Sequence, residues 1–147
     1  MTIDTKNLII KPSTIPGAGK GLFTKVLIPK DTMIIEYTGD ICTWKEVKDE
    51  FDNDYIYYVN SQHVINARHR MDSKGRYIND ASGFKKIKGM SNNCMYKKIG
   101  TRVYVQAIRD IPPRSELLVS YGKGYWDTGR LNAEIAAAEA KKKKKQD

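Results

Sequence analysis

Short apolar runs that end at proline, glycine or polar turn residues recur along most of this 147-residue chain. The runs are rich in β-branched and aromatic residues, which favour strands, and they are too short for ordinary helices. We therefore expect strands at residues 8–10, 21–26, 32–37, 55–59, 64–66, 94–96, 102–108 and 116–119. The fourth and fifth runs, and the sixth and seventh, are close enough in the chain to form hairpins. Many short strands with few helices favour a β-rich α+β domain.

Three segments have helical signatures instead. Thr43 and Glu46 have the spacing of a capping box, which predicts a short helix that ends near residue 51. Residues 72–78 are expected to form a short helical turn. Residues 131–138 place apolar side chains at helical spacing in an alanine-rich stretch, which predicts a helix that frays into lysines.

The size of the chain indicates one main domain, which we place at residues 1–127, followed by a C-terminal helix and lysine-rich tail at residues 128–147. A chain of this length can bury roughly two-thirds of its unfolded surface. No stretch approaches the ~20 apolar residues of a membrane span. The first six residues contain no apolar run typical of a secretory signal. We therefore expect an intracellular protein without a membrane partner.

Cysteine and histidine are too few and too scattered for a zinc cluster. The chain has two cysteines, Cys42 and Cys94, and two histidines, His63 and His69. None of the four has the close spacing of metal ligands. We expect no bound metal and two free thiols in a reducing compartment.

The chain is basic, with a formal net charge of +9. Residues 141–147 hold five lysines and one aspartate, so the tail supplies +4 and the rest of the chain +5. A basic surface suits nucleic acid or another polyanion. Three interpretations of the lysine run remain open: a solubilising tail, an attraction to nucleosomal DNA, and a nuclear address.

The glycine-rich segment Gly17-Ala-Gly-Lys-Gly21 differs from the two common phosphate-binding patterns. It is no P-loop, because Gly21 stands where serine or threonine follows the lysine. It is no dinucleotide fingerprint, because Leu22 occupies the last glycine position. Glycines here allow positive φ angles and the close approach of a ligand, although a plain turn would also use them.

Two further segments accompany it, Gly75-Arg-Tyr-Ile-Asn79 and Glu116-Leu-Leu-Val-Ser-Tyr-Gly-Lys-Gly-Tyr-Trp126. In this order and at this spacing, the three segments resemble the SET domain, the fold of most protein lysine methyltransferases. The resemblance covers roughly residues 7–127. It implies a SET (β-clip-like) fold of several short sheets with a knot-like C-terminal active site. The chain is similar to the small viral and PR-type members, which lack the flanking zinc-bound segments.

The resemblance implies S-adenosylmethionine as the cofactor. In the family the backbone of the glycine-rich loop contacts the methionine end of the cofactor, and a tyrosine, an asparagine and its neighbour make further contacts. An aromatic residue near the end of the domain adds to the wall of the site. Carried over to this chain, the cofactor-binding residues are Ala18, Gly19, Lys20, Tyr55, Asn79, Asp80, Tyr121 and Trp126.

Three residues are expected at the reaction centre by the same resemblance. Tyr121 matches the tyrosine that SET enzymes place beside the transferred methyl group, and Tyr37 matches one that lines the channel for the target lysine. Val119 matches the position where a bulky aromatic residue restricts the number of methyl groups. A valine there implies room for dimethyl- or trimethyl-lysine.

The chain departs from the family pattern after Asn79. Asp80 replaces the usual histidine and Ala81 the usual serine, and a lysine- and glycine-rich loop at residues 82–91 follows. This loop is either a solvated surface loop or a contact for substrate or a polyanion. The departure favours an alternative in which the chain is a catalytically silent SET or PR-like module that binds chromatin or a protein partner.

We interpret the chain as a protein-lysine N-methyltransferase that acts on a basic peptide, with a histone as the expected substrate because histones are common targets in this family. The acidic stretch at residues 46–54 is a candidate surface for such a peptide. A chromatin substrate favours the nucleus over the cytoplasm. A third hypothesis, a basic nucleic-acid-binding domain, lacks a recognisable groove-reading motif.

Overall fold

The computed structural model describes residues 2–50, 53, 55–81 and 91–121. The expected C-terminal helix, the boundary at residue 127 and the loop at residues 82–90 lie outside these ranges. The elements are η1 (Thr5–Asn7), β1 (Leu8–Pro12), β2 (Lys20–Thr24), β3 (Met33–Glu36), β4 (Asp40–Cys42), α1 (Trp44–Val47), β5 (Ile56–Asn60), β6 (His63–Asn66), η2 (Lys74–Tyr77), β7 (Cys94–Ile99) and β8 (Arg102–Ala107).

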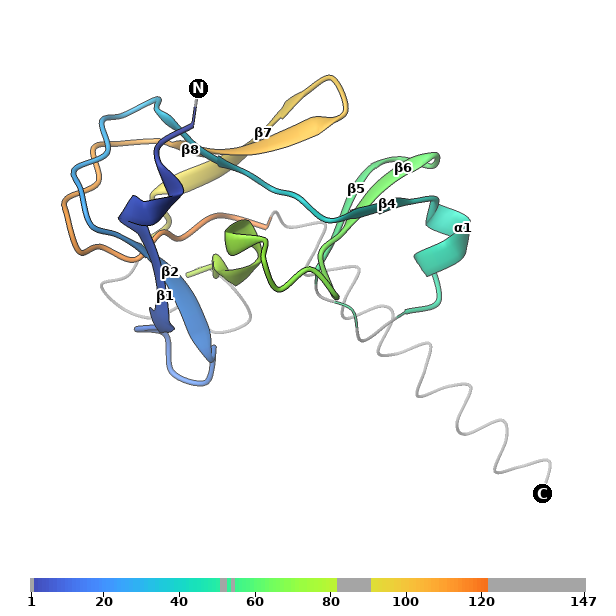
Figure 1. Ribbon diagram of the computed structural model, residues 1–147, viewed down its shortest axis with the longest axis horizontal. Coiled ribbons are helices and arrows are strands. Elements are labelled where there is room, and N and C mark those ends of the chain that lie inside the picture. Colours follow the sequence, from blue (N-terminus) through green and yellow to red (C-terminus); the bar gives the residue numbers. More distant parts are fainter. Residues whose placement is uncertain (1, 51–52, 54, 82–90, 122–147) are drawn as a thin grey trace.

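The strands form three small antiparallel sheets, which confirms the β-rich α+β prediction (Figure 1). Their strand orders are β1-β2, β3-β8-β7 and β4-β6-β5. The two expected hairpins, β5 with β6 and β7 with β8, are both present. Small sheets of this kind cannot each enclose a core, so they must share one.

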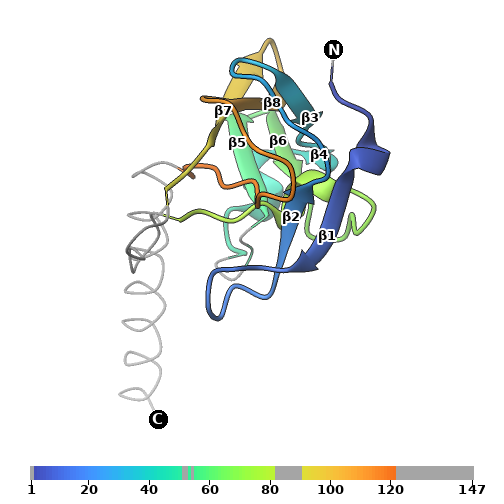
Figure 2. The ribbon, with the colours of Figure 1, turned by 90° about the vertical axis from the view of Figure 1, so that its left-hand side faces the viewer.

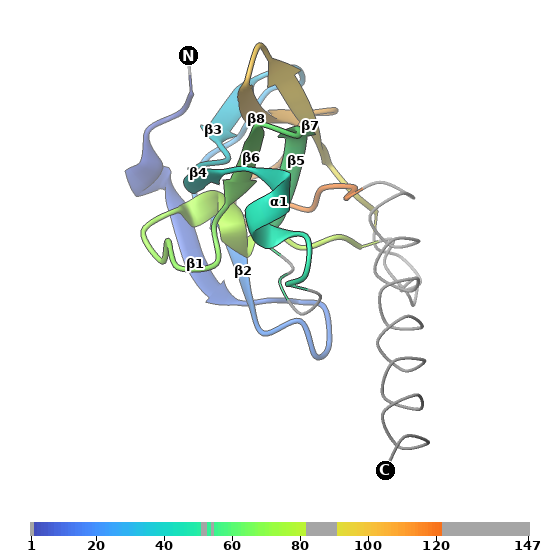
Figure 3. The ribbon, with the colours of Figure 1, turned by 90° about the vertical axis from the view of Figure 1, so that its right-hand side faces the viewer.

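The 3-10 segment η2 lies at the centre of the arrangement. Figure 1 shows it between the β1–β2 hairpin and the β4-β6-β5 sheet, and it contacts both β1 and β2. In Figure 2, which is turned by 90°, β7 and β8 lie above the same hairpin. Figure 3 shows α1 on the outer side of the β4-β6-β5 sheet, away from the hairpin. The residues that follow η2 therefore reach the place where the sheets meet.

The main core draws apolar side chains from most of the described chain. Its buried members are Leu8, Leu22, Ile28, Ile34, Ile35, Ile78, Cys94, Val105, Ala107, Ile111, Leu117 and Val119. A second cluster contains Tyr37, which follows β3, Ile65 of β6, Ala67, which follows β6, and Val103 of β8. Tyr96 packs against both clusters, so it connects the two halves of the interior.

The predicted last strand at residues 116–119 is wrong. This segment makes only isolated bridges, in which Glu116 pairs with Phe23, Leu118 with Asn79, and Val119 with Cys94. The segment threads between three neighbours and stays beside each for only one residue, so no continuous ladder forms. An apolar run predicts burial, but it does not tell a strand from a buried extended segment.

Smaller differences concern where elements end. The helix α1 stops at Val47, earlier than residue 51, although the Glu46 carboxylate accepts hydrogen bonds from Thr43 N–H at 3.0 Å and from its hydroxyl at 2.9 Å. These bonds lower the pKa of Glu46. Strand β1 continues through Pro12, which is tolerated because β1 pairs with only one neighbouring strand.

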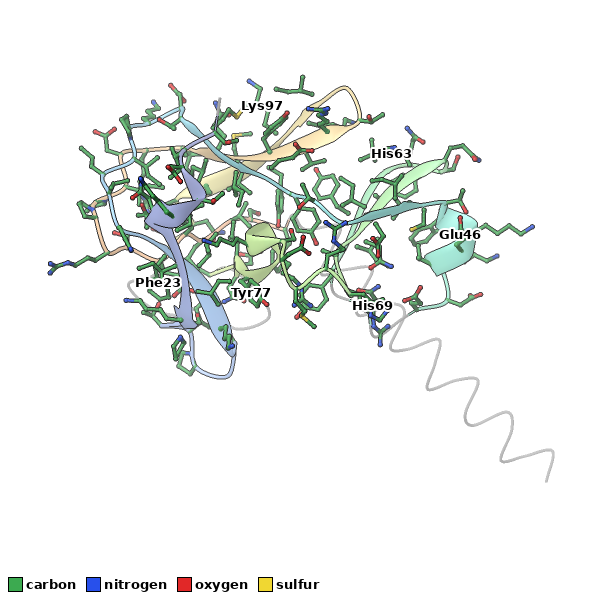
Figure 4. All side chains as sticks on the ribbon, in the orientation of Figure 1. Phe23, Glu46, His63, His69, Tyr77 and Lys97 are labelled. Carbon is green, nitrogen blue, oxygen red and sulfur yellow. The ribbon has the colours of Figure 1, made fainter. Side chains whose placement is uncertain are left out.

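The described part of the chain contains no helix long and apolar enough to cross a membrane. Within the same ranges, no group of three or more histidine, cysteine, aspartate or glutamate side chains could hold a metal ion. Figure 4 shows His63 and His69 well apart, at different ends of the β4-β6-β5 region.

We predict that Gly39→Ala destabilises the protein by about 1–3 kcal/mol, the range typical of overpacking. A Cβ at Gly39 would lie 2.6 Å from the carbonyl carbon and oxygen of Asn66, which are backbone atoms that cannot swing aside. Gly75→Ala is the matched control, because its nearest contacts would be ordinary ones at 3.6 Å. Urea denaturation measures the free energy of unfolding of both variants. Equal midpoints for the two variants would contradict the prediction.

Candidate functional site

The glycine-rich segment forms the turn between β1 and β2. Gly17 and Gly19 adopt φ angles of 78° and 71°, a region that favours glycine. The Ser13 N–H donates to the Gly19 carbonyl at 2.8 Å, which closes the turn. A Cβ at either glycine would meet no heavy atom within 4 Å. One side of this backbone is therefore open to the approach of a ligand, next to Ala18.

The carboxylate of Glu116 anchors this turn to the rest of the fold. It accepts hydrogen bonds from the Ser13 hydroxyl at 2.7 Å, from the Thr14 N–H at 2.8 Å and from the Thr14 hydroxyl at 2.6 Å. Glu116 is only 7% exposed, so these donors replace the water that a carboxylate needs. Gly21 leaves room for it, since a Cβ there would collide with the carboxylate.

Asn79 ties the turn to the segment that carries Val119. Its side-chain amide donates to the Lys20 carbonyl at 3.0 Å, and its backbone carbonyl accepts from the Val119 N–H at 2.9 Å. Lys20, Asn79 and Val119 are far apart in sequence, and the structure joins them directly. Val119 itself is fully buried in the main core.

Asn93 holds the segment before Val119 in place. Its side chain donates to the Glu116 carbonyl at 2.9 Å and accepts from the Leu118 N–H at 2.8 Å. The Leu118 carbonyl in turn accepts from the backbone N–H groups of Asn93 and Cys94, each at 2.9 Å. An asparagine amide offers both a donor and an acceptor, so it can replace a neighbouring strand for this stretch.

Tyr121 is fixed by contacts at both ends of the residue. Its phenol donates to the Ile78 carbonyl at 2.5 Å, and its backbone N–H donates to the Asp80 carboxylate at 2.9 Å. Its ring stacks with Tyr96 at a centroid distance of 6.5 Å and an interplanar angle of 18°. The side chain expected at the reaction centre therefore has a defined orientation.

Tyr96 connects Tyr121 to a cluster of further tyrosines. Its ring meets Tyr37 edge-on at 6.0 Å and Tyr57 at 5.2 Å. The Tyr37 hydroxyl donates to the Tyr55 carbonyl at 2.8 Å. Burial raises the pKa of Tyr37, against a smaller opposing effect of the Arg76 charge, and burial also raises the pKa of Tyr57. The phenols of Tyr37 and Tyr57 therefore stay neutral, and Tyr37 is itself buried.

Arg76 brings a buried positive charge to the edge of this cluster. Its guanidinium lies over the Tyr55 ring, 4.1 Å from the centroid, and is 5.2 Å from the centroid of Tyr77. The residue is only 9% exposed. Figure 4 shows Tyr77 on η2, in the centre of the molecule. Arg76 stacks on aromatic faces as guanidinium groups often do, and its positive charge acts to lower the pKa of Tyr37.

The structure brings most of the expected site residues into one connected set. Hydrogen bonds join Lys20, Asn79, Val119, Asp80 and Tyr121 through their shared neighbours. Tyr37 and Tyr55 join this set through the aromatic cluster, and Ala18 and Gly19 lie in the turn beside it. Trp126 lies outside the described residues.

Four residues of the site were not predicted from sequence: Arg76, Asn93, Tyr96 and Glu116. Glu116 left a signal, because it is a charged residue directly before the apolar run at residues 117–119. Arg76 left none, because it follows Lys74 in a segment that is polar in sequence. Asn93 left a signal of another kind, because Asn93 and Cys94 resemble the asparagine-cysteine pair that SET domains usually carry. Tyr96 left none that separates it from an ordinary strand residue. Their roles depend on the distant segments that they contact.

The acidic stretch at residues 46–54 is less negative than its sequence indicates. Glu50 forms an ion pair with Arg68 at 3.3 Å, and Lys45 and Lys48 are exposed on or beside the same short helix. Figure 4 shows Glu46 on α1, at the far side of the molecule from β1 and β2. Residues 51, 52 and 54 lie outside the described ranges.

Comparison with known proteins now identifies the class. The model of the SET domain family matches residues 19–122, which is well over half of the chain. The chain belongs to the SET domain family. A similar solved structure is the methyltransferase domain of human PR domain-containing protein 2, with a TM-score of 0.59 and 25% identity over 79% of this chain and 77% of that one.

We predict that Glu116→Ala lowers the free energy of unfolding by about 1–3 kcal/mol, because several hydrogen-bond donors lose their acceptor. Glu116→Gln keeps the shape and one acceptor oxygen, so it should lose less. Asp49→Ala is the control, an exposed carboxylate beyond the end of α1 whose removal should cost no more than about 0.5 kcal/mol. Urea denaturation distinguishes the three. An unchanged midpoint for Glu116→Ala would show that the turn is held by other contacts.

Proposed function

We propose that this protein is an S-adenosylmethionine-dependent protein-lysine N-methyltransferase. Family membership supports a SET methyltransferase in general. The observation that carries the specific proposal is the position of Tyr121. Its hydrogen bonds to Ile78 and Asp80 join it to the segment next to the glycine-rich turn, and its ring contact with Tyr96 joins it to the aromatic cluster. This is the arrangement that a reaction between a cofactor on one side and a lysine on the other requires.

The chain offers suitable groups for the cofactor. The open face of the turn at Gly17 and Gly19 fits the close approach of a polar ligand to the backbone. Electron-rich tyrosine rings attract a positively charged sulfonium. Ala18, Gly19, Lys20, Asn79 and Asp80 would hold the cofactor on the turn side, with Tyr55, Tyr121 and Trp126 as further contacts. When bound, S-adenosylmethionine supplies an activated methyl group.

The residues of the site favour a neutral lysine amine, which is the nucleophilic form. A free lysine has a pKa of about 10.4 and is almost wholly protonated at neutral pH. The burial that raises the pKa of Tyr37 would also disfavour an ammonium beside it, and the Arg76 charge acts in the same direction. The lysine loses its proton to water at the mouth of the site, so no dedicated base is needed.

Tyr121 would orient this amine. Its hydroxyl hydrogen is committed to the Ile78 carbonyl, and a phenol oxygen that donates its hydrogen can still accept one from an amine N–H. Its ring and that of Tyr96 restrict the direction from which a lysine side chain arrives. Correct alignment of two reacting atoms can supply several kcal/mol of the barrier reduction.

We further propose a histone lysine as the substrate, dimethylation or trimethylation as the product, and chromatin in the nucleus as the place of action. The small side chain of Val119 supports the degree of methylation. The basic surface, with a net charge of +9, supports an electrostatic contact with nucleosomal DNA through the lysine run at residues 141–145.

A catalytically silent SET module is the second candidate, and the replacement of histidine by Asp80 favours it. Calorimetry with S-adenosylmethionine and a methyl-transfer assay on each histone separate the two. Binding with transfer supports the enzyme. A folded protein that binds no cofactor and transfers no methyl group supports the silent module.

We predict that Tyr121→Phe lowers kcat by about 10²- to 10³-fold, the size of effect seen when one oriented polar group is lost from an active site. The variant also loses the hydrogen bond to Ile78, so a thermal melt must show that it remains folded. Tyr58→Phe makes the same chemical change at a side chain that is 53% exposed and serves as the control. A folded Tyr121→Phe protein with normal turnover would reject the role.

We predict that Val119→Tyr restricts the product to monomethyl-lysine, because a larger ring would fill the space near the amine. Val119 is fully buried, so overpacking should also cost about 1–3 kcal/mol. Val119→Phe adds the ring without the hydroxyl and is a second test if the tyrosine variant fails to fold. Mass spectrometry of a lysine peptide gives the product distribution. An unchanged distribution from either folded variant counts against the assignment.

A further inference from the structure

Asp80 is a buried carboxylate that joins two distant parts of the chain. It is 8% exposed. One of its oxygens accepts from the backbone N–H of Tyr121 at 2.9 Å, and the other accepts from the side-chain amide of Asn92 at 3.0 Å. A buried carboxylate requires such donors, and donors that face a full negative charge bind more strongly than those that face a neutral oxygen.

The orientation of Asn92 follows from a further contact. Its side-chain oxygen accepts from the Ala81 N–H at 2.8 Å, so its NH₂ group must be the end that faces Asp80. Two hydrogen bonds and the main chain between Asp80 and Ala81 thus join Asp80, Ala81 and Asn92 in a ring. This ring joins the residues on both sides of the lysine-rich loop, whichever path that loop takes.

The same short segment holds Tyr121 at two points. The Ile78 carbonyl fixes the phenol, and the Asp80 carboxylate fixes the backbone nitrogen of the same residue. Because the main chain between Ile78 and Asp80 is itself paired with Leu118 and Val119, the two anchors keep a constant separation. The two bonds together therefore set the direction of the Tyr121 side chain between its backbone nitrogen and its phenol.

We propose that Asp80 and Asn92 are a pair of positioning residues that aim Tyr121 for methyl transfer. This inference rests on the proposed function. It also accounts for the departure from the family pattern, because a neutral histidine has at most one acceptor nitrogen and could not serve both donors. Asp80 then supplies the acceptor that the Asn92 amide requires, and its presence does not indicate a silent module.

An exchange of the two side chains tests the pair. Asp80→Asn alone turns a donor toward either Asn92 or the Tyr121 N–H, and Asn92→Asp alone places two carboxylates together. In the double variant, the new amide at position 80 would accept from the Tyr121 N–H and donate to the new carboxylate at position 92. That carboxylate would still accept from the Ala81 N–H. The double variant keeps the net charge and gives each of the three donors in this arrangement an acceptor.

We expect each single variant to lose about 10- to 100-fold in kcat, with a smaller change in KM, because misplacement of an orienting group by about 1 Å costs this much. The double variant should recover to within a few-fold of the unmodified protein. Asp80→His, which installs the usual family residue, should lose activity as well. Asp110→Asn, at an exposed carboxylate outside the site whose oxygen accepts from the Lys30 N–H, controls for the loss of one charge.

A measurement on Tyr121 itself separates this inference from the proposed function. The chain has nine tyrosines, so ¹⁵N-tyrosine labelling gives a simple amide spectrum, and the Tyr121→Phe variant assigns the peak. The Tyr121 amide should shift in each single variant and return in the double variant. If the unmodified protein transfers no methyl group, the proposed function fails, and this peak alone decides the pairing. A peak unmoved in Asp80→Asn, or a double variant no better than the worse single one, overturns the proposal.

Discussion

The structure depends on how the polar backbone of residues 116–121 is satisfied without a strand on either side. Buried N–H and C=O groups need partners, and this segment finds them in separate places: the side chain of Asn93, the main chain of Asn79 and the carboxylate of Asp80. Each partner comes from a different position in the fold. The segment that carries Tyr121 is therefore located by polar groups of other segments, and its own apolar side chains fill the core around them.

Glu116 extends the same principle to the glycine-rich turn. Its carbonyl is held by Asn93 while its carboxylate holds Ser13 and Thr14, so one residue links the interior to the turn that would receive the cofactor. The aromatic cluster on the other side of Tyr121 is organised by ring packing and by the hydrogen bond from the Tyr37 hydroxyl to the Tyr55 carbonyl. The two sides of the site are thus built from different physical interactions.

Local signals in the sequence predicted most of the fold. The hairpins β5–β6 and β7–β8, the turn at η2 and the capping box of α1 all depend on neighbours within a few residues, and all are present. The strand expected at residues 116–119 was wrong because its environment is set by residues up to 103 positions away. The contact of Asp80 with Asn92 was equally invisible, since the family comparison marks Asp80 only as a missing histidine. Residue propensity and spacing describe one segment at a time. The isolated bridges of residues 116–119 and the contact of Asp80 with Asn92 each depend on two segments, so neither could be predicted in this way.

The separation between Ser13 and Glu116 also bears on how the molecule forms. Their hydrogen bond spans 103 positions, and the one from Tyr121 to Asp80 spans 41. Closing such long loops costs entropy before any contact compensates for it, so folds with many distant pairings assemble slowly. During synthesis on the ribosome, β1 and β2 can pair early. The turn between them can bind the Glu116 carboxylate only after nearly the whole domain has been made. The turn that the proposed cofactor would contact is therefore completed only after most of the domain has been synthesised.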